Sequence, residues 1–333
     1  MNIKEQVKPY AKANKKKSFI QILNTVVPYI LLMSFMIFLI DIGLPYYITI
    51  LFTIPAGLFM VRVFILFHDC THLSFYSKKK SNIILGHILG VLVFTPYFIW
   101  QSDHNIHHGS VGNLDKRGTG DVWTMTVKEY IESSKMKKFI YRLYRNPFFL
   151  FFIAPFFLFA VLNRLPSRKF KSKKHQLSNI ITSLGILSIF LFVGFTFGFK
   201  HYILTQIPVL YIASVSGVWL FFIQHQFEEV YWKHHDDWDF VEAAIKGSSF
   251  YKLPWLLDWI TGHIGFHHIH HLNPRIPNYN LRLCYKSIKG IDEENTVTLF
   301  KSFKLSLLKL YDENKGRLVT FKELKKNKDL HPQ

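Results

Sequence analysis

The sequence predicts an all-α integral membrane protein in which four transmembrane helices carry a cytoplasmic helical cap. Three observations support this fold class. Long apolar runs alternate with polar segments, Lys and Arg gather on one side of those runs, and histidines form three clusters near the ends of the runs. The 333 residues are 49% hydrophobic and 17% aromatic, which suits a membrane protein with substantial polar parts, and we expect a single domain over residues 1–333.

Four apolar runs are long enough to span a bilayer, which takes about 20 residues in a helix. They cover residues 19–40, 45–67, 177–199 and 202–223. Only a few residues separate the first run from the second and the third from the fourth, so the runs pair into two hairpins. We expect the remaining segments, 68–176 and 224–333, to lie in the cytoplasm or at the membrane interface.

Basic residues determine the expected orientation. They precede the first span and recur in SKKK at 77–80 and RKFKSKK at 168–174, whereas the hairpin tips carry almost none. By the positive-inside rule, both termini and the long middle segment are then cytoplasmic. Two further apolar runs, 82–100 and 148–162, are short or interrupted by Gly and Pro, and we expect them to lie in the interface or to enter the bilayer partway. A full crossing by 82–100 would place the histidines that follow it on the outer face, so we favour four spans.

The net charge is +19, with 41 Lys and Arg against 22 Asp and Glu. In a membrane protein, the partners of such charge are anionic lipid headgroups and acidic proteins. The sequence contains no groove-reading module, so we expect no nucleic-acid partner. Near the C-terminal end, residues 296–311 carry lysines within an apolar stripe. This pattern indicates an amphipathic helix, either resting on the membrane or forming an ordinary surface helix.

The three histidine clusters have the spacing of metal ligands on helices. HDCTH contains two histidines four residues apart, whereas HNIHH and HHIHH each add a third histidine at the i+3 position. The members are His68, His72, His104, His107, His108, His267, His270 and His271. Residues three and four apart share one face of a helix, and all three clusters are cytoplasmic in the topology above. They can therefore meet at one metal ion or at a pair of ions.

The number of ligands and the missing motifs indicate the type of metal. Eight imidazoles exceed the four ligands of tetrahedral zinc. The chain has neither the HExxH motif of zinc peptidases nor the ExxH motif of carboxylate di-iron bundles, and its two cysteines form no CxxC pair. Two redox-active ions with open positions fit best, and at a membrane surface they suggest oxygen chemistry on a lipid chain. A metal transporter would instead carry its ligands within the spans, near the midplane.

HDCTH, HNIHH and HHIHH resemble the three histidine boxes of the membrane-bound fatty acid desaturases. The resemblance covers nearly the whole chain, because the order and spacing of the boxes and the pattern of spans all match. Within that family the chain is most similar to the bacterial acyl-lipid desaturases of delta-5 type, which act on phospholipids. The similar segments are NLDKRGTGDVW at 113–123, GSSFYKLP at 247–254 and HLNPRIPNYNL at 271–281.

The resemblance implies a di-iron centre held by nine histidines, with His225 in FFIQHQFEEV as the ninth. It also implies O2 as co-substrate and a cis double bond introduced into the fatty acyl chains of phospholipids in a bacterial plasma membrane. Because the sequence has no flavin or nicotinamide fingerprint, we expect a separate ferredoxin or flavodoxin to supply the electrons. A di-iron hydroxylase of lipid or alkane chains has similar boxes and is the alternative. The double-bond position and the oligomeric state stay open.

Other residues near the clusters are candidates for positioning the imidazoles. Carboxylates that could accept a hydrogen bond from the second ring nitrogen of a ligand are Asp69, Asp103, Glu228 and Glu229. On a continuous helix, His263 would lie one turn before His267 and share its face, so it is a candidate for a water-mediated contact with the metals. His268 would point about 100° away from His267, and we expect a structural role for it.

Overall fold

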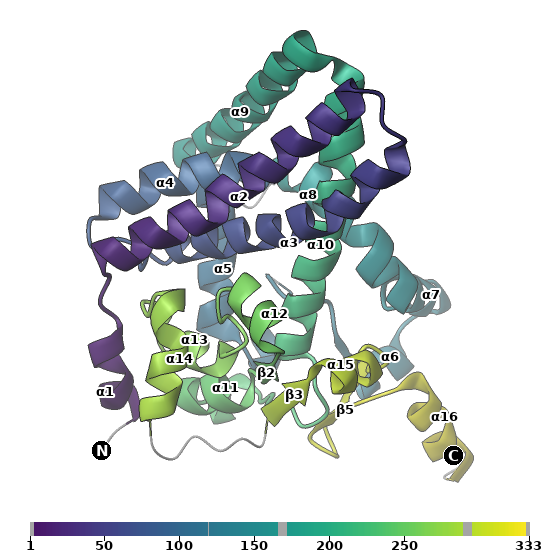
Figure 1. Ribbon diagram of the computed structural model, residues 1–333. Helices are drawn as coiled ribbons and strands as arrows, with labels where there is room; N and C mark the ends of the chain where they lie inside the picture. Colours follow the sequence, from purple (N-terminus) through teal and green to yellow (C-terminus); the bar gives the residue numbers. More distant parts are fainter. Residues whose placement is uncertain (1–2, 119, 166–171, 289–294, 331–333) are drawn as a thin grey trace.

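The computed structural model describes residues 3–118, 120–165, 172–288 and 295–330. Long helices form a bundle at one end, and short helices and strands form a cap at the other, where both termini lie (Figure 1). The long helices are α2 Lys15–Asp41, α3 Tyr46–Thr71, α9 Lys173–Phe197 and α10 Phe199–His225. These four coincide with the four predicted spans. Within the described ranges, they are the helices long and apolar enough to cross a membrane singly, and two bent helix pairs would raise the count to six.

α3 and α10 form the centre of the bundle. In their most apolar stretches, 56% of the residues of α3 and 39% of those of α10 are buried, against 22% for α2 and 11% for α9. Gly57 allows α3 to approach α10 closely, because a Cβ atom at this position would come within 2.6 Å of Ile212 Cγ2. The outer helices expose large apolar side chains such as Leu31 and Phe192. Apolar surfaces of this extent suit helices that face lipid.

The first bent pair consists of α4 Lys79–Leu92 and α5 Tyr97–Ser110, which meet at 102° and cover the apolar run 82–100. His72 precedes this pair and His104 lies within α5, yet both belong to one cluster whose ligand atoms lie within 4.8 Å of one another. A single crossing would separate the two ends by about 30 Å. The pair therefore returns to the side that it left, as we expect for a segment that enters the bilayer partway.

The second bent pair consists of α7 Lys135–Tyr144 and the helical segment 149–164, joined at 56°. This segment contains a π-helix, Phe149–Ile153, then α8, Ala154–Ala160, and a 3-10 turn, Leu162–Arg164. At its end, Arg164 donates to the carbonyl of Phe94, at the bend between α4 and α5, and Asn179 of α9 donates to the carbonyl of Arg164. α9 begins beside α5, with Ser102 Oγ 2.9 Å from His175 Nε2. α7 is amphipathic: Met136 and Phe139 are exposed on one face while Tyr141 is buried.

Both hairpin tips lie at the end of the bundle away from the cap (Figure 1). The tip between α9 and α10 is Gly198 alone, whose φ of +109° is open to glycine and strained for other residues. The basic run 77–80 leads into α4 on the cap side. Of the basic run 168–174, residues 168–171 lie outside the described residues, and Lys173 and Lys174 are exposed at the start of α9.

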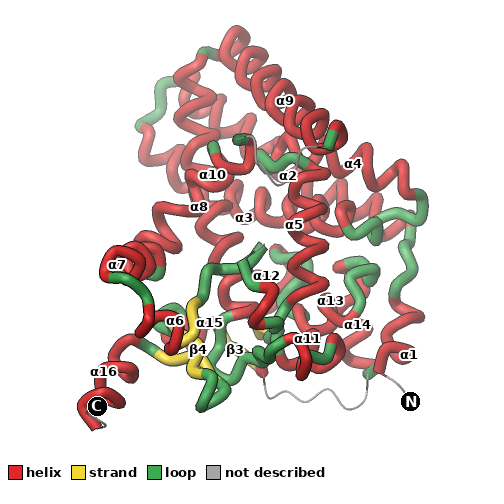
Figure 2. The backbone as a smooth tube through the Cα atoms, turned by 180° about the vertical axis from the view of Figure 1, so that it is seen from behind, coloured by secondary structure: helices red, strands yellow, loops and turns green. Residues whose placement is uncertain are grey.

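The cap is built from short elements. Its α-helices are α1 Ile3–Val7, α6 Val127–Glu132, α11 Phe240–Lys246, α12 Trp255–Ile260, α13 His267–Leu272, α14 Asn278–Ser287, α15 Leu299–Leu305 and α16 Phe321–Leu330. Its strands, which the sequence did not predict, are β1 Met125–Thr126, β2 Phe250–Lys252, β3 Thr296–Thr298, β4 Leu310–Asp312 and β5 Arg317–Val319. β4 pairs parallel to β1 and antiparallel to β5, and β2 pairs parallel to β3. Figure 2 shows the short strands in yellow within the cap. The chain is therefore mostly helical, with two small sheets in the cap.

The expectation of one amphipathic helix over 296–311 is wrong. Residues 296–298 pair with β2, the Thr298 side chain caps α15, and α15 ends after seven residues, before β4 begins. The partner strands lie far away in the sequence, so this tertiary pairing leaves no trace in the local apolar period. Phe300 and Phe303 still form an exposed apolar face on the short helix.

Arg145 is a fully buried cation that ties the bundle to the cap. One terminal nitrogen donates to the carbonyl of Trp123 and to Thr124 Oγ1, and the other to Gln226 Oε1 and the carbonyl of Leu308. These acceptors come from three distant segments. Because burying a charge is costly without such partners, the fold depends on all three segments reaching the guanidinium together.

Lys309 generates a prediction about pH. Burial, reinforced by the charge of Arg145, lowers the pKa of Lys309 to about 7. In the unfolded chain the pKa of lysine is about 10.4. As the pH falls from about 10 to about 7, the unfolded chain therefore binds a proton that the folded protein does not, and stability falls over this window. We expect Lys309→Met to raise the Tm at pH 7 by about 2–4 °C and to flatten the rise of Tm between pH 7 and 10.

The measurement is thermal unfolding of the detergent-solubilised protein across this pH range. Lys301→Met, on the exposed face of α15, is the matched control and keeps the pH dependence of the unaltered protein. An unchanged pH profile in the Lys309 variant would show that this lysine does not titrate in the folded state.

Candidate metal centre

Nine buried histidines converge in two groups at the junction of the bundle and the cap. The five-histidine group is His68, His72, His104, His108 and His270. The four-histidine group is His107, His225, His267 and His271. Within each group the ligand atoms lie within 4.8 Å of one another. All nine residues are buried, and the most exposed of them, His72 and His104, have only 8% of their surface accessible to solvent.

The spacing of the histidines along their helices decides which group each one joins. In α5, the i, i+4 pair His104 and His108 belongs to the five-histidine group, and His107 belongs to the other. In α13, the i, i+4 pair His267 and His271 belongs to the four-histidine group, and His270 crosses to the other. Neighbouring residues on a helix point about 100° apart, so one short helix supplies ligands to both sides.

The remaining ligands lie at the ends of the long helices. His68 is in the last turn of α3, and His72 follows the end of that helix directly. His225 is the last residue of α10. The two central helices of the bundle thus end at the metal centre, α3 at the five-histidine group and α10 at the four-histidine group.

The Nε2 atoms of the imidazoles face one another at short range. In the five-histidine group, 3.0 Å separates each of the pairs His68 and His104, His104 and His108, and His108 and His270. In the four-histidine group, the Nε2 atoms of His107 and His225 are 3.1 Å apart, those of His225 and His267 2.9 Å, and those of His267 and His271 3.1 Å. One nitrogen often faces two others, and a neutral imidazole has only one N–H to donate. Hydrogen bonds alone therefore cannot satisfy either group.

A pair of metal ions fits this arrangement. Ligands about 2.1 Å from an ion lie about 3.0 Å apart at right angles and about 3.4 Å apart at tetrahedral angles. The observed distances between Nε2 atoms match the value for right angles, which favours ions with five or six coordination positions over tetrahedral zinc. Imidazole is a good ligand for iron, copper, nickel and zinc. The residues present are therefore able to hold two transition-metal ions.

The outer nitrogens of two rings are held by the protein. His107 Nδ1 lies 2.5 Å from Asp121 Oδ1, and His225 Nδ1 lies 3.3 Å from the carbonyl oxygen of Gly247. An oxygen of this kind only accepts, so Nδ1 carries the proton and the Nε2 lone pair faces the group. Such contacts orient metal-bound histidines and raise their basicity.

Burial keeps the imidazoles of α13 neutral. Burial, together with the charge of neighbouring imidazoles, lowers the pKa of His267, His270 and His271 well below the usual value for histidine. The neutral ring is the form that binds metal ions. Protons therefore compete weakly for these positions near pH 7.

The carboxylates selected from the sequence have different environments. Asp69 Oδ2 accepts hydrogen bonds from the Asn278 main-chain N (2.7 Å) and from Asn278 Nδ2 (2.8 Å), and its other oxygen is 3.5 Å from His68 Nδ1. It thereby connects the first ligand helix to the start of α14. Asp103 lies on the wall of the cavity described below. The side chains of Glu228 and Glu229 are exposed, and the structure does not bring them to the buried imidazoles.

His263 does not share a helix face with His267, so the premise of its expected role is wrong. α13 begins only at His267, after a turn in which Gly262 and His263 have φ values of +58° and +60°. The imidazole of His263 instead pairs with Asp258, with Nδ1 2.7 Å from Oδ2. His268 lies outside both groups and packs against the ring of Tyr285.

The sequence reasoning missed Asp121, although a signal was present. The carboxylate follows Gly118 and Gly120, which have φ values of +100° and +72°. A Cβ atom at Gly120 would come within 2.9 Å of His107 Cβ. The glycines thus let the loop pass close to His107 and place the carboxylate on its ring. A glycine-rich loop ending in an acidic residue, shortly after a histidine cluster, is the pattern to look for.

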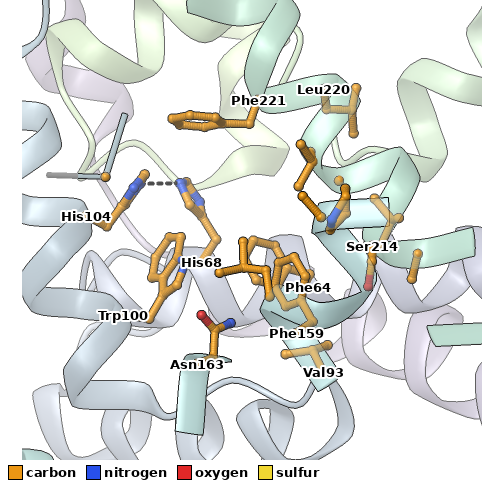
Figure 3. A pocket seen from close by; sticks show the side chains of 18 of the residues that line it. Phe64, His68, Val93, Trp100, His104, Phe159, Asn163, Ser214, Leu220 and Phe221 are labelled. Carbon is orange, nitrogen blue, oxygen red and sulfur yellow. Dashed lines mark hydrogen bonds between the residues drawn. The ribbon is translucent and has the colours of Figure 1, made fainter. Parts of the chain in front are cut away.

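An apolar cavity of about 530 Å³ adjoins both groups. Its wall includes His68 and His104 from one group and His267 from the other. The Trp100 ring stacks on His104 at 4.1 Å (Figure 3). From there the cavity follows α10 into the bundle, between Gln224 and Leu210. A long apolar ligand could thus extend from the metal centre into the membrane-spanning region.

The chain is similar to known proteins over most of its length. The family model described as "Fatty acid desaturase" matches residues 44–303. A "Fatty acid desaturase" of Bacillus subtilis (strain 168) is 41% identical over 321 residues, covering 96% of this chain and 90% of the relative. An "sn-1 acyl-lipid omega-3 desaturase (ferredoxin)" of Nostoc sp. (strain 36) is 28% identical, covering 72% of this chain and 67% of the relative. An "sn-1 oleoyl-lipid 12-desaturase" of Synechocystis sp. is 26% identical, covering 74% and 70%.

The division into two groups predicts separate metal losses. We expect His270→Ala to weaken the five-histidine group and His107→Ala to weaken the four-histidine group, each lowering bound metal by about one ion per chain. Elemental analysis of the purified protein measures this. His234→Ala on the cap surface, where the ring contacts Asp115 and Glu313, is the control and keeps the full metal content. Unchanged metal in both ligand variants would rule out the assignment.

The contact between Asp121 and His107 predicts a weaker effect. Asp121→Asn removes the negative charge next to the ring while keeping an acceptor oxygen, so we expect metal affinity to fall about 10- to 100-fold without loss of the fold. The measurement is the rate and extent of metal removal by a chelator. Asp236→Asn, an exposed carboxylate of the cap, should behave like the unaltered chain. Equal metal retention in the two variants would mean that Asp121 does not support the ligand.

Proposed function

This chain belongs to the fatty acid desaturase family, and on that premise we propose that it introduces a cis double bond into the fatty acyl chains of membrane phospholipids. The proposed reactants are O2, two electrons from a separate protein and two protons. The observation that carries the proposal is the apolar cavity whose wall contains imidazoles from both histidine groups. A long chain bound in this cavity would have two adjacent methylenes within reach of both metal positions.

The proposed reaction balances as one –CH2–CH2– unit, O2, two electrons and two protons giving one –CH=CH– unit and two waters. We assign the five-histidine group to one iron and the four-histidine group to the other. When bound, such an iron pair supplies the reduction of O2 and the oxidising power that removes the two hydrogens. The contribution of the chain is binding, orientation and exclusion of water.

Aromatic side chains flank the imidazoles in the wall of the cavity. Trp100 covers His104, and the Phe221 ring lies 5.2 Å from His107 and 5.1 Å from His225 (Figure 3). Both aromatic rings also line the cavity. A methylene chain in contact with these rings follows a fixed path past the metal centre. Holding the reacting carbons in position in this way increases the rate of the reaction. The same rings keep bulk water away from the reacting carbons.

The position of the cavity supports a lipid-linked substrate. Leu158 and Leu162 line the cavity and are also exposed. The cavity therefore borders the apolar surface that we assign to lipid, which suits an acyl chain better than a water-soluble substrate. The names of two cyanobacterial relatives describe acyl-lipid and oleoyl-lipid substrates, which supports the same substrate class here.

The electron donor that we propose is a small acidic ferredoxin or flavodoxin. The net charge of +19 favours an acidic partner, and the names of two relatives include ferredoxin. We further propose that the chain lies in a bacterial plasma membrane with both termini and the cap in the cytoplasm. The basic residues on the cap side of the bundle support this orientation.

The test is expression in a host that makes no unsaturated lipids, followed by gas chromatography of total fatty acids. We expect new monounsaturated chains in the phospholipid fraction, and no product from the His107→Ala variant. Hydroxylated chains without alkenes would contradict desaturation and favour the hydroxylase alternative. With purified protein, a reduced ferredoxin or flavodoxin should support turnover, and failure of both would contradict the proposed donors.

A further inference from the structure

Gly217 stands in the interior of α10 without a packing reason. Glycine inside a helix is less stable than alanine. Other bundle glycines have close neighbours that require them: a Cβ atom at Gly57 would lie 2.6 Å from Ile212, and one at Gly185 would lie 2.6 Å from Val91. At Gly217 no heavy atom lies within 4 Å of the added carbon. Since this residue lines the cavity, the missing side chain leaves space for a ligand rather than for another helix.

Ser214 lies in the same wall of the cavity as Gly217, one helical turn earlier. It is three residues before Gly217, on the same face of α10, and it also lines the cavity. Its hydroxyl is buried and has no hydrogen-bond partner among the described residues. An unpaired buried hydroxyl is unfavourable for folding, so stability does not account for this residue either. Ser214 lies on the opposite side of the cavity from His104 (Figure 3).

These positions define an arm of the cavity that leads away from the metal centre. With a rise of 1.5 Å per residue, Gly217 is about 12 Å and Ser214 about 16 Å along the helix from His225. The walls around this arm are apolar, including Met60 and Leu210, and the described lining residues contain no Lys or Arg. A phosphate headgroup would be buried there without a partner, so the methyl end of an acyl chain is what fits the arm.

We propose that Gly217 determines how much of the methyl end of the acyl chain fits beyond the metal centre. It thereby selects the length of the chain and the pair of carbons that is desaturated. This inference rests on the proposed function. A larger side chain at position 217 shortens the arm, so the carbons presented to the metals lie closer to the methyl end, or a shorter chain is used.

The test compares Gly217→Leu and Gly217→Ala with Ser216→Leu. Ser216 is next to Gly217 on α10 but does not line the cavity, so it is a matched control for bulk in the same helical turn. Each variant is expressed in the host that makes no unsaturated lipids. Chain length and double-bond position in the phospholipids are then determined by mass spectrometry, and a size-exclusion profile checks that each variant is folded.

With Gly217→Leu, we expect the double bond to move toward the methyl end or the ratio of shorter to longer products to rise about 10-fold. Gly217→Ala should change the products in the same direction but by less, and Ser216→Leu should give the same products as the unaltered chain. If Gly217→Leu gives no product, the alanine variant decides, and an unchanged product pattern there overturns the proposal. An equal shift with Ser216→Leu also overturns it. If the unaltered chain itself makes no alkene, the proposed function fails, and this inference fails with it.

Discussion

The structure depends on keeping nine imidazoles buried and pointing toward each other. Nitrogen lone pairs that converge at about 3 Å repel one another unless a cation lies among them, so this arrangement is stable only as a metal site. The long helices have a direct part in it. α3 and α10 pack against each other in the bundle and end with His72 at the C-cap of one and His225 as the last residue of the other. The membrane-spanning helices therefore set the positions of ligands that lie outside the spans.

The cap supplies the groups that hold the outer side of these ligands. Arg145 binds Thr124 and Gln226, which follow closely after Asp121 and His225 in the sequence. Through its contact with the carbonyl of Leu308, the same guanidinium joins both segments to the C-terminal part of the cap. The four-histidine group thus depends on a buried charge that never touches an imidazole. On the other side, Asp69 fixes α14 relative to α3, which supports the five-histidine group.

The features that could be predicted from the sequence are those with a local pattern. The four spans were predicted because an uninterrupted apolar run of about 20 residues is typical of a helix that crosses a bilayer. Eight of the nine clustered histidines were found by their i, i+3 and i+4 spacing, whereas His225 has no local pattern and came only from the resemblance. The division of each cluster between two groups was not predicted, because it depends on where α5 and α13 lie in space. The strands of the cap were also missed, because β3 and β4 pair with segments more than 40 residues earlier.

The order of the ligands along the chain has a consequence for biosynthesis. The first ligand is His68 and the last are in α13, and each group needs at least one residue of α13 to be complete. A ribosome must therefore have synthesised the chain beyond His271, and both helical hairpins must have entered the membrane, before either ion can be held by its full set of ligands. The helices of the bundle therefore have to pack against one another in the membrane before any metal ion is bound. Loading with metal is then a late maturation step, and it joins segments that extend from His68 to His271.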